Sequence, residues 1–168
     1  IPMMKLRMAE VPHLIDHQDV GGMSDIEIGA DTIRIGAMVT QHAIIDHDGL
    51  AAAAPILREA ALQIADPQIR YMGTVGGNVA NGDPGNDMPC LMQCLDATFT
   101  VVGADGERDI PAREFYEAAY MTAREDEEVL TAVTISKPKG GYAYEKQKRK
   151  FGDYATAAAA VQIVKDGG

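Results

Sequence analysis

The stretch of residues 70–89, RYMGTVGGNVANGDPGNDMP, contains the groups best suited to holding an anionic ligand. Gly76 and Gly77 lack a Cβ atom, so their backbone can take positive φ and bring N–H groups close to a diphosphate. Thr74 and Asn78 flank them with a hydroxyl and an amide that can bind phosphate or ribose oxygens. The stretch predicts a nucleotide-binding loop. A surface turn is the alternative, because Gly, Asn, Asp and Pro dominate turns for local reasons.

Neither common phosphate-binding motif is present in this stretch. A Rossmann fold requires G-x-G-x-x-G between a strand and a helix, and a P-loop ends in Gly-Lys-Ser/Thr. Nucleotide binding here therefore requires a different fold.

The cysteines and histidines do not predict a metal site. Cys90 and Cys94 are the two cysteines of the chain and would share one helix face. Because zinc and iron–sulfur sites need further ligands, we expect buried, inert thiols and place any iron–sulfur centre on a partner. His13 and His17 lie in an extended segment, and His42 lies on a short helix without an evident partner. We assign no catalytic residue.

Two polar segments lie outside the glycine-rich centre. Asp83 and Asp87, in GDPGND, favour turn or N-cap positions. The alternation in YAYEKQK predicts a strand with one polar and aromatic side, and a solvated basic face is the alternative for KQKRK. That side of the strand carries Tyr142, Tyr144, Lys146 and Lys148.

Composition favours a globular protein and excludes several classes of function. With 168 residues and 46% hydrophobic residues, the chain can bury the core of one domain or of two small lobes. The net charge of −10 argues against nucleic-acid binding, which depends on Lys and Arg. We find no apolar run of about 18 residues and no signal peptide, and we expect a cytoplasmic protein.

Hydrophobic patterning predicts an α+β fold without internal repeats. Thr40 is expected to cap a short helix, and Pro55 to begin a helix with one apolar face that ends before Asp66. The Ala-rich run at 155–160 has helical propensity, but the alternation after it favours a strand. Predicted strands cover 25–37 with a turn at 29–30, 98–102, 129–135 and the region from 142; predicted helices cover 40–46, 55–65, 89–94 and 111–120.

Two further segments indicate boundaries. The Pro/Gly-rich residues 137–141 separate two strand-like runs and predict a domain boundary. Residues 165–168, KDGG, predict the turn of a hairpin whose second strand is missing.

Three segments together resemble a known family. IADPQIRYMGTVGGNVANGDPGNDMP is similar to the second FAD-binding loop of the flavoprotein (medium) subunits of molybdenum hydroxylases, which include xanthine and carbon monoxide dehydrogenases. GYAYEKQKRKFGDYATAAAAV resembles the junction to the C-terminal domain of that family, and IPMMKLRMAEVPHLIDH resembles the segment after its first FAD loop. The segments most similar to the medium subunits of aerobic carbon monoxide dehydrogenases are DPQIRYMGT, NGDPGNDMP, YEKQKRK and GDYATAAAA.

The resemblance implies a domain plan. Residues 1–138 are expected to form a PCMH-type FAD-binding domain, and residues 139–168 the start of a C-terminal flavoprotein domain. The first FAD loop of the family, of the Ala-Gly-Gly-x-Ser kind, has no counterpart before Ile1. We therefore expect a chain truncated at both ends, with a flavin between its two lobes.

The resemblance also implies the cofactor contacts. Asp87 matches an acidic ligand that we expect to bind ribose hydroxyls, Lys146 matches a lysine near the FAD, and Tyr154 is expected against the isoalloxazine ring unless it is a core residue. The complete set is Thr74, Val75, Gly76, Gly77, Asn78, Asp87, Leu130, Lys146 and Tyr154.

The implied function is electron transfer. FAD in this subunit would receive electrons from [2Fe-2S] clusters of a small subunit and pass them to an external acceptor. A large subunit with the molybdenum cofactor would oxidise the substrate, most closely CO to CO2, in a dimer of heterotrimers. The alternatives are a purine, aldehyde or N-heterocycle dehydrogenase, and a flavin-free assembly module.

Overall fold

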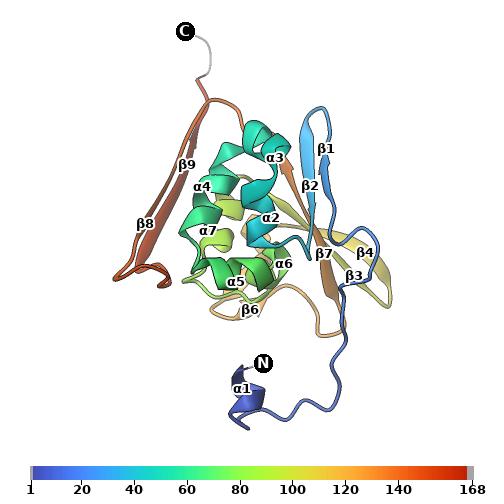
Figure 1. Cartoon of the computed structure of the whole chain (residues 1–168). Coiled ribbons are helices and arrows are strands. Elements are labelled where there is room, and N and C mark those ends of the chain that lie inside the picture. The colour runs from blue at the N-terminus through green and yellow to red at the C-terminus, as the bar shows by residue number, and fades with distance from the viewer. Residues whose placement is uncertain (1, 166–168) are drawn as a thin grey trace.

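A five-stranded antiparallel sheet forms one side of the molecule (Figure 1). The computed structural model describes residues 2–165. The central strand is paired on both sides, so residues far apart in the sequence meet in one sheet. In spatial order the strands are β1 (Ile26–Ile28), β2 (Thr32–Gly36), β7 (Val129–Ser136), β3 (Thr98–Gly103) and β4 (Gly106–Pro111).

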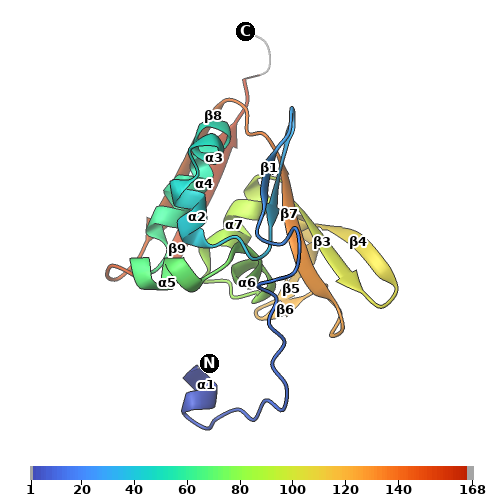
Figure 2. The same ribbon diagram turned by 45° about the vertical axis from the view of Figure 1, so that its right-hand side comes forward.

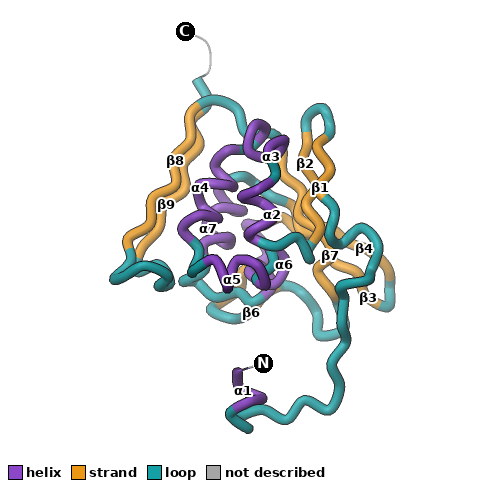
Figure 3. Tube along the Cα trace, in the orientation of Figure 1, coloured by secondary structure: helices purple, strands orange, loops and turns teal. Residues whose placement is uncertain are grey.

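Helices lie between this sheet and a separate hairpin of two strands (Figure 3). The hairpin contacts α4 and α7, and Figure 2 shows the same order of layers from a second angle. The helical layer contains α2 (Gln41–Asp46), α3 (Asp48–Ala53), α4 (Pro55–Gln63), α5 (Pro67–Met72), α6 (Val75–Ala80) and α7 (Asp87–Cys94). The remaining elements are α1 (Pro2–Lys5), α8 (Ala112–Phe115), β5 (Tyr116–Ala118), β6 (Met121–Thr122) and the hairpin strands β8 (Gly141–Gln147) and β9 (Ala157–Ile163).

The core lies between the sheet and the helices. Ile33 and Ile35 of β2 are fully buried, and Phe99 of β3 packs edge-on against Phe115 at 4.7 Å between ring centroids. Burying one such side chain stabilises the fold by about 1.5–3 kcal/mol. The predicted apolar face of α4 is confirmed, since it is buried at Ile56, Leu57, Ala60, Ala61 and Ile64.

The α+β class and several element predictions are confirmed. The Thr40 hydroxyl accepts the Ala43 N–H at 3.1 Å and caps α2 as expected. Residues 157–160 of the Ala-rich run form the first half of β9, which pairs with β8 along its whole length. The helix predicted at Pro89 begins two residues earlier, at Asp87.

Two predictions of irregular structure were wrong. The glycine-rich stretch contains two short helices, α5 and α6, because Asp66 and Thr74 each accept a backbone N–H three residues later and so cap them. Strand β4 was missed because it is an edge strand with polar residues, of which Ile110 alone is buried. The hairpin turn predicted at 165–168 lies beyond Lys165, outside the described residues.

No helix among residues 2–165 combines the length and the apolar character needed to cross a membrane.

Candidate functional site

The glycine pair lies in the first turn of α6 and does not adopt the predicted conformation. Neither Gly76 nor Gly77 has positive φ. The Gly76 N–H donates to the Ala37 carbonyl at 2.9 Å, and the Gly77 N–H donates to the Thr74 hydroxyl at 3.0 Å. The expectation of two free N–H groups was therefore wrong, because helix capping and packing against the residue after β2 use both donors.

The two glycines instead serve two different spatial requirements. A Cβ atom on Gly76 would lie 2.4 Å from the Ala37 Cβ, so α6 approaches this close only with glycine there. A Cβ atom on Gly77 would meet one atom within 4 Å, the Thr74 hydroxyl oxygen at 3.0 Å. Gly76 is thus needed for packing, whereas Gly77 leaves space beside α6 open.

That space is a cavity of about 320 Å³, which we call the glycine cavity. Of the predicted contacts it is lined by Thr74, Gly76, Gly77 and Leu130. Arg124 brings a positive charge to its wall and is held by two hydrogen bonds from its Nη1 to the backbone oxygens of Glu125 and Glu128. The Thr74 hydroxyl accepts from Gly77, so its hydrogen remains available to a ligand. The cavity therefore offers a cation and a neutral donor, and it is also lined by Glu128, whose carboxylate is paired with Arg108.

A second cavity, of about 270 Å³, lies beside the β8–β9 hairpin and is called the hairpin cavity. It contains the other predicted contacts, Asn78, Asp87, Lys146 and Tyr154. Successive helix residues turn by about 100°, so Asn78 lies roughly opposite Gly76 on α6 and about a quarter turn from Gly77. The predicted contacts thus form two groups separated by one helix. Val75 lines neither cavity, because its side chain is fully buried in the core.

A buried ion pair forms one wall of the hairpin cavity. Lys146 Nζ lies 2.8 Å from Asp87 Oδ2, and the two side chains are 1% and 4% exposed. The Tyr144 hydroxyl donates to Asp87 Oδ1 at 2.5 Å, and Lys146 also donates to the Gln63 carbonyl at 3.3 Å. Burial, together with this hydrogen bond, holds the pKa of Tyr144 well above its usual range. Asp87 therefore fastens β8 to α7, and the charge of Lys146 is already balanced within the protein.

Asn78 and Tyr154 complete this cavity from its two ends. The Asn78 side-chain oxygen accepts the Met88 N–H at 3.3 Å, and the Asn78 backbone carbonyl accepts from the Asn86 side-chain amide at 3.1 Å, which ties α6 to α7. Tyr154 is 66% exposed and is therefore no core residue. The Ala155 N–H donates to the Gly85 carbonyl at 3.2 Å and fixes the loop that carries Tyr154. An aromatic ring thus stands at the mouth of the cavity.

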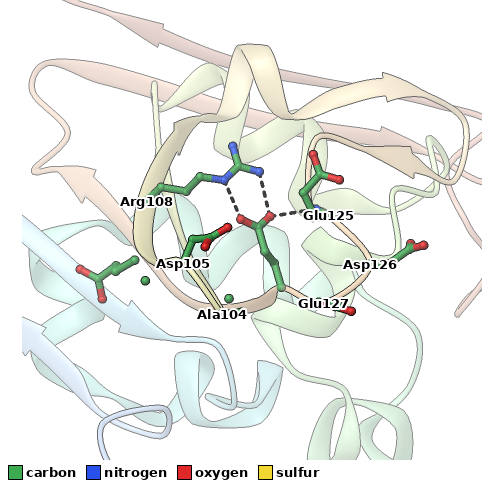
Figure 4. A pocket seen from close by; sticks show the side chains of 10 residues that line it. Ala104, Asp105, Arg108, Glu125, Asp126 and Glu127 are labelled. Atoms are coloured by element: carbon green, nitrogen blue, oxygen red, sulfur yellow. Dashed lines mark hydrogen bonds and ion pairs between the residues drawn. The ribbon is translucent and has the colours of Figure 1, made fainter.

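A third cavity, of about 340 Å³, is acidic and unsuited to a diphosphate. In Figure 4, Arg108 reaches from β4 towards the loop of Glu125, Asp126 and Glu127, and Asp105 lies nearby. The Arg108 hydrogen bonds to Glu128, at 2.6 and 2.8 Å, are the main cause that lowers the pKa of Glu128 to about 2. Since the single arginine is paired, the remaining carboxylates would repel an anion.

The cysteines and histidines contribute no metal site within residues 2–165, where no three His, Cys, Asp or Glu side chains are grouped to hold an ion. Cys90 and Cys94 are free and half-buried, and burial raises the pKa of Cys94. His42 does have a partner, contrary to expectation: its Nε2 lies 3.0 Å from Asp46 Oδ2.

Sequence reasoning missed several residues that line the two cavities. Arg124 is the one basic residue in the acidic run AREDEE, and this position could have marked it as a candidate ligand-binding residue. His17 and Met38 of the glycine cavity, and Ile69 of the hairpin cavity, carry no local signal because only the tertiary fold brings them there.

Comparison with known proteins identifies the relatives of this arrangement. The family described as FAD binding domain in molybdopterin dehydrogenase matches residues 1–138. The carbon monoxide dehydrogenase medium chain of Afipia carboxidovorans is 59% identical over all of this chain, and that of Hydrogenophaga pseudoflava is 44% identical over 99% of it. The chain covers 59% of the length of both relatives.

Solved structures agree with these matches. The Cu,Mo-CO dehydrogenase in its cyanide-inactivated form superposes with a TM-score of 0.94 at 57% identity, over 99% of this chain and 59% of that one. Quinoline 2-oxidoreductase from Pseudomonas putida 86 superposes with a TM-score of 0.93 at 32% identity, with the same coverage.

Proposed function

The chain belongs to the family of FAD-binding domains of molybdopterin dehydrogenases, and from this premise we propose that it is the flavin-carrying part of an electron-transfer subunit. Its FAD would receive electrons from [2Fe-2S] clusters of a small partner subunit and pass them to an external acceptor. When bound, FAD supplies the redox chemistry, and the protein binds and orients it. Residues 1–138 would hold the cofactor, and residues 139–168 would begin the C-terminal flavoprotein domain.

The observation that carries this proposal is the division of the expected contacts between two cavities on either side of α6. In the glycine cavity, the Thr74 hydroxyl would donate to a diphosphate oxygen, Arg124 would offset its charge, and Leu130 would provide an apolar wall. Gly77 would leave room for the diphosphate, because any larger side chain there would project into this space.

In the hairpin cavity, Tyr154 would lie against the flavin ring. Each carboxylate oxygen of Asp87 has a further lone pair beyond the hydrogen bond it accepts, so Asp87 would also accept from a sugar hydroxyl. Lys146 would contact the cofactor as a hydrogen-bond donor, because Asp87 already balances its charge. Asn78 would form the link between the two cavities.

We propose that the complete enzyme oxidises CO with water to CO2, two protons and two electrons. The support is the 59% and 44% identity to two carbon monoxide dehydrogenase medium chains. A nicotine 6-hydroxylase medium subunit and a caffeine dehydrogenase subunit are 34% and 30% identical, so the same domain serves enzymes with other substrates. The substrate would be set by a large molybdenum subunit, in a cytoplasmic dimer of heterotrimers.

The test is the visible absorption spectrum of the full-length subunit purified with its neighbouring subunits. We expect the flavin bands in near-stoichiometric amount, release of FAD on denaturation, and CO-dependent reduction of a dye. A folded complex without flavin would instead support the assembly module. Flavin without CO-dependent reduction would support a dehydrogenase for a purine, an aldehyde or an N-heterocycle.

A further inference from the structure

The loop of residues 81–86, which we call the α6–α7 loop, is held by a carboxylate outside the expected cofactor contacts. Asp83 Oδ1 accepts the Gly85 N–H at 2.8 Å, and the Asp83 carbonyl accepts the Asn86 N–H at 3.0 Å. Asp83 lines neither the glycine cavity nor the hairpin cavity. It therefore shapes the loop without contacting the space in which a cofactor would lie.

The second oxygen of Asp83 is held from the turn between β5 and β6. The Tyr120 hydroxyl donates to Asp83 Oδ2 at 3.0 Å, and the Tyr120 N–H donates to the Gly82 carbonyl at 2.8 Å. Tyr120 is 65% exposed, so burial does not account for its position. Its φ of +60° is a left-handed conformation that is strained for a residue with a large side chain. Strained residues persist where the surrounding structure holds them, and they cluster at functional sites.

The other side of the α6–α7 loop meets the tyrosine that is expected against the flavin. The Gly85 carbonyl accepts the Ala155 N–H at 3.2 Å. A Cβ atom on Gly85 would lie 3.4 Å from the Tyr154 Cβ and 3.7 Å from its Cδ1, so Gly85 lies directly beside this residue. Because the Tyr154 side chain is 66% exposed, core packing does not fix it, and its contacts with the loop decide where the ring stands.

These contacts form one continuous network from the β5–β6 turn to the hairpin cavity. The Tyr120 hydroxyl holds one oxygen of Asp83, and the other oxygen holds Gly85. Gly85 in turn holds the backbone beside Tyr154. The hydrogen bond to Asp83 is the main cause that raises the pKa of Tyr120, and Tyr154 contributes to the same rise. A displacement at one end of such a network is transmitted through its contacts to the other.

We propose that Asp83 is a positioning residue for the flavin: held by Tyr120, it keeps the ring of Tyr154 against the isoalloxazine. This inference rests on the proposed function, since it takes Tyr154 to contact the flavin ring. Asp83 itself would touch neither the ring nor the diphosphate. Without its carboxylate, the Gly85 N–H and the Tyr120 hydroxyl would lose their acceptor, and the loop that carries Tyr154 would lose its fixed place beside α7.

The experiment titrates FAD into the complete complex after its flavin has been removed, and records the affinity for FAD, the fluorescence of the bound flavin and Tm. A phenol stacked on an isoalloxazine ring quenches flavin fluorescence, so this signal reports where Tyr154 stands. Asp83→Ala should raise the fluorescence and weaken FAD binding by about two- to tenfold, the range for loss of one aromatic stacking contact. Tyr120→Phe removes one hydroxyl and should change both in the same direction by less. Asp83→Asn keeps an oxygen for the Gly85 N–H and should recover most of the wild-type signal.

The decisive comparison repeats Asp83→Ala in a Tyr154→Leu background. Tyr154→Leu alone should leave the flavin unquenched, and adding Asp83→Ala should then change neither fluorescence nor affinity, because Asp83 acts through Tyr154. Glu59→Ala is the matched control. It also removes a carboxylate that accepts a tyrosine hydroxyl at 3.0 Å, from Tyr142, but this hydrogen bond joins α4 to β8. The control should keep wild-type affinity and fluorescence.

Several results would overturn the inference. Wild-type fluorescence and affinity in both Asp83→Ala and Tyr120→Phe would refute the positioning role and leave the proposed function intact. An equal effect of Asp83→Ala with and without Tyr154 would refute it as well. Should Asp83→Ala fail to fold, Tyr120→Phe is compared in the same two backgrounds and decides in its place. A wild-type flavin as bright as that of Tyr154→Leu would remove the contact on which the inference rests, and a wild-type complex without flavin would refute the proposed function itself.

Discussion

Replacement of Lys146 by Met tests the buried pair that fastens the β8–β9 hairpin to the helices. The change keeps most of the side-chain volume but removes the ammonium group 2.8 Å from Asp87. Among the described residues, the Tyr144 hydroxyl would then be the one hydrogen-bond donor left to a carboxylate that is 4% exposed. Removing one partner of a buried ion pair costs about 3–5 kcal/mol, which corresponds to a fall in Tm of about 6–20 °C for a domain of this size.

The assay is thermal unfolding of the full-length subunit followed by circular dichroism. The double variant Asp87→Asn/Lys146→Met removes both charges and should recover part of the loss. The control is Arg113→Met, because Arg113 and Asp96 form an even shorter pair, at 2.5 Å, whose side chains are 64% and 72% exposed. We expect the control to leave Tm unchanged. If Lys146→Met is as stable as Arg113→Met, the reasoning that this pair holds the hairpin is refuted.

Three further predictions concern the cofactor and the pH dependence of stability. Gly77→Val in the full-length subunit should abolish FAD retention with little loss of Tm, whereas Gly76→Ala should lower Tm strongly. Flavin content and Tm are measured together for both variants, and full flavin occupancy in Gly77→Val would exclude the role of Gly77 in leaving room for the diphosphate. The Arg108–Glu128 pair stabilises the fold at pH values above 4.5, the ordinary pKa of the carboxyl group, and this contribution is lost as the pH falls towards 2. Arg108→Gln should therefore reduce the change in the free energy of unfolding between pH 4.5 and pH 2. Because its pKa is raised, Tyr144 should ionise only when the protein unfolds in alkali, so its contribution to the free energy of unfolding is present below pH 10 and lost above it. Tyr144→Phe should remove this late-ionising tyrosine from a spectrophotometric titration.

Predictions from the sequence succeeded where local chemistry decides the structure. The Thr40 cap and the apolar face of α4 depend on residues within one or two turns, so their spacing is sufficient. The Ala-rich run is a partial exception. Its propensity is helical, and the alternation that follows it, together with the resemblance, indicated a strand.

Predictions failed where distant segments decide the structure. The glycine pair was predicted to lie in a nucleotide-binding loop. Gly76 is instead glycine because α6 packs against Ala37, thirty-nine residues earlier in the chain. The partnership of Asp87 with Lys146 joins residues fifty-nine positions apart, and neither residue type indicates the other. The expected contacts in the glycine-rich stretch came from residue types, whereas Asp87, Leu130, Lys146 and Tyr154 came from the resemblance. Their division into two cavities required the fold.

The position of α6 between the two cavities has a consequence for the choice of cofactor. An α-helix with its side chains is about 10–12 Å wide, so a ligand that occupies both cavities must be long enough to pass around it. In the proposed arrangement the flavin ring lies in the hairpin cavity and the diphosphate in the glycine cavity, so the ribityl chain that joins them would pass around α6. The width of α6 therefore sets a minimum length for the part of the cofactor between its ring and its first phosphate.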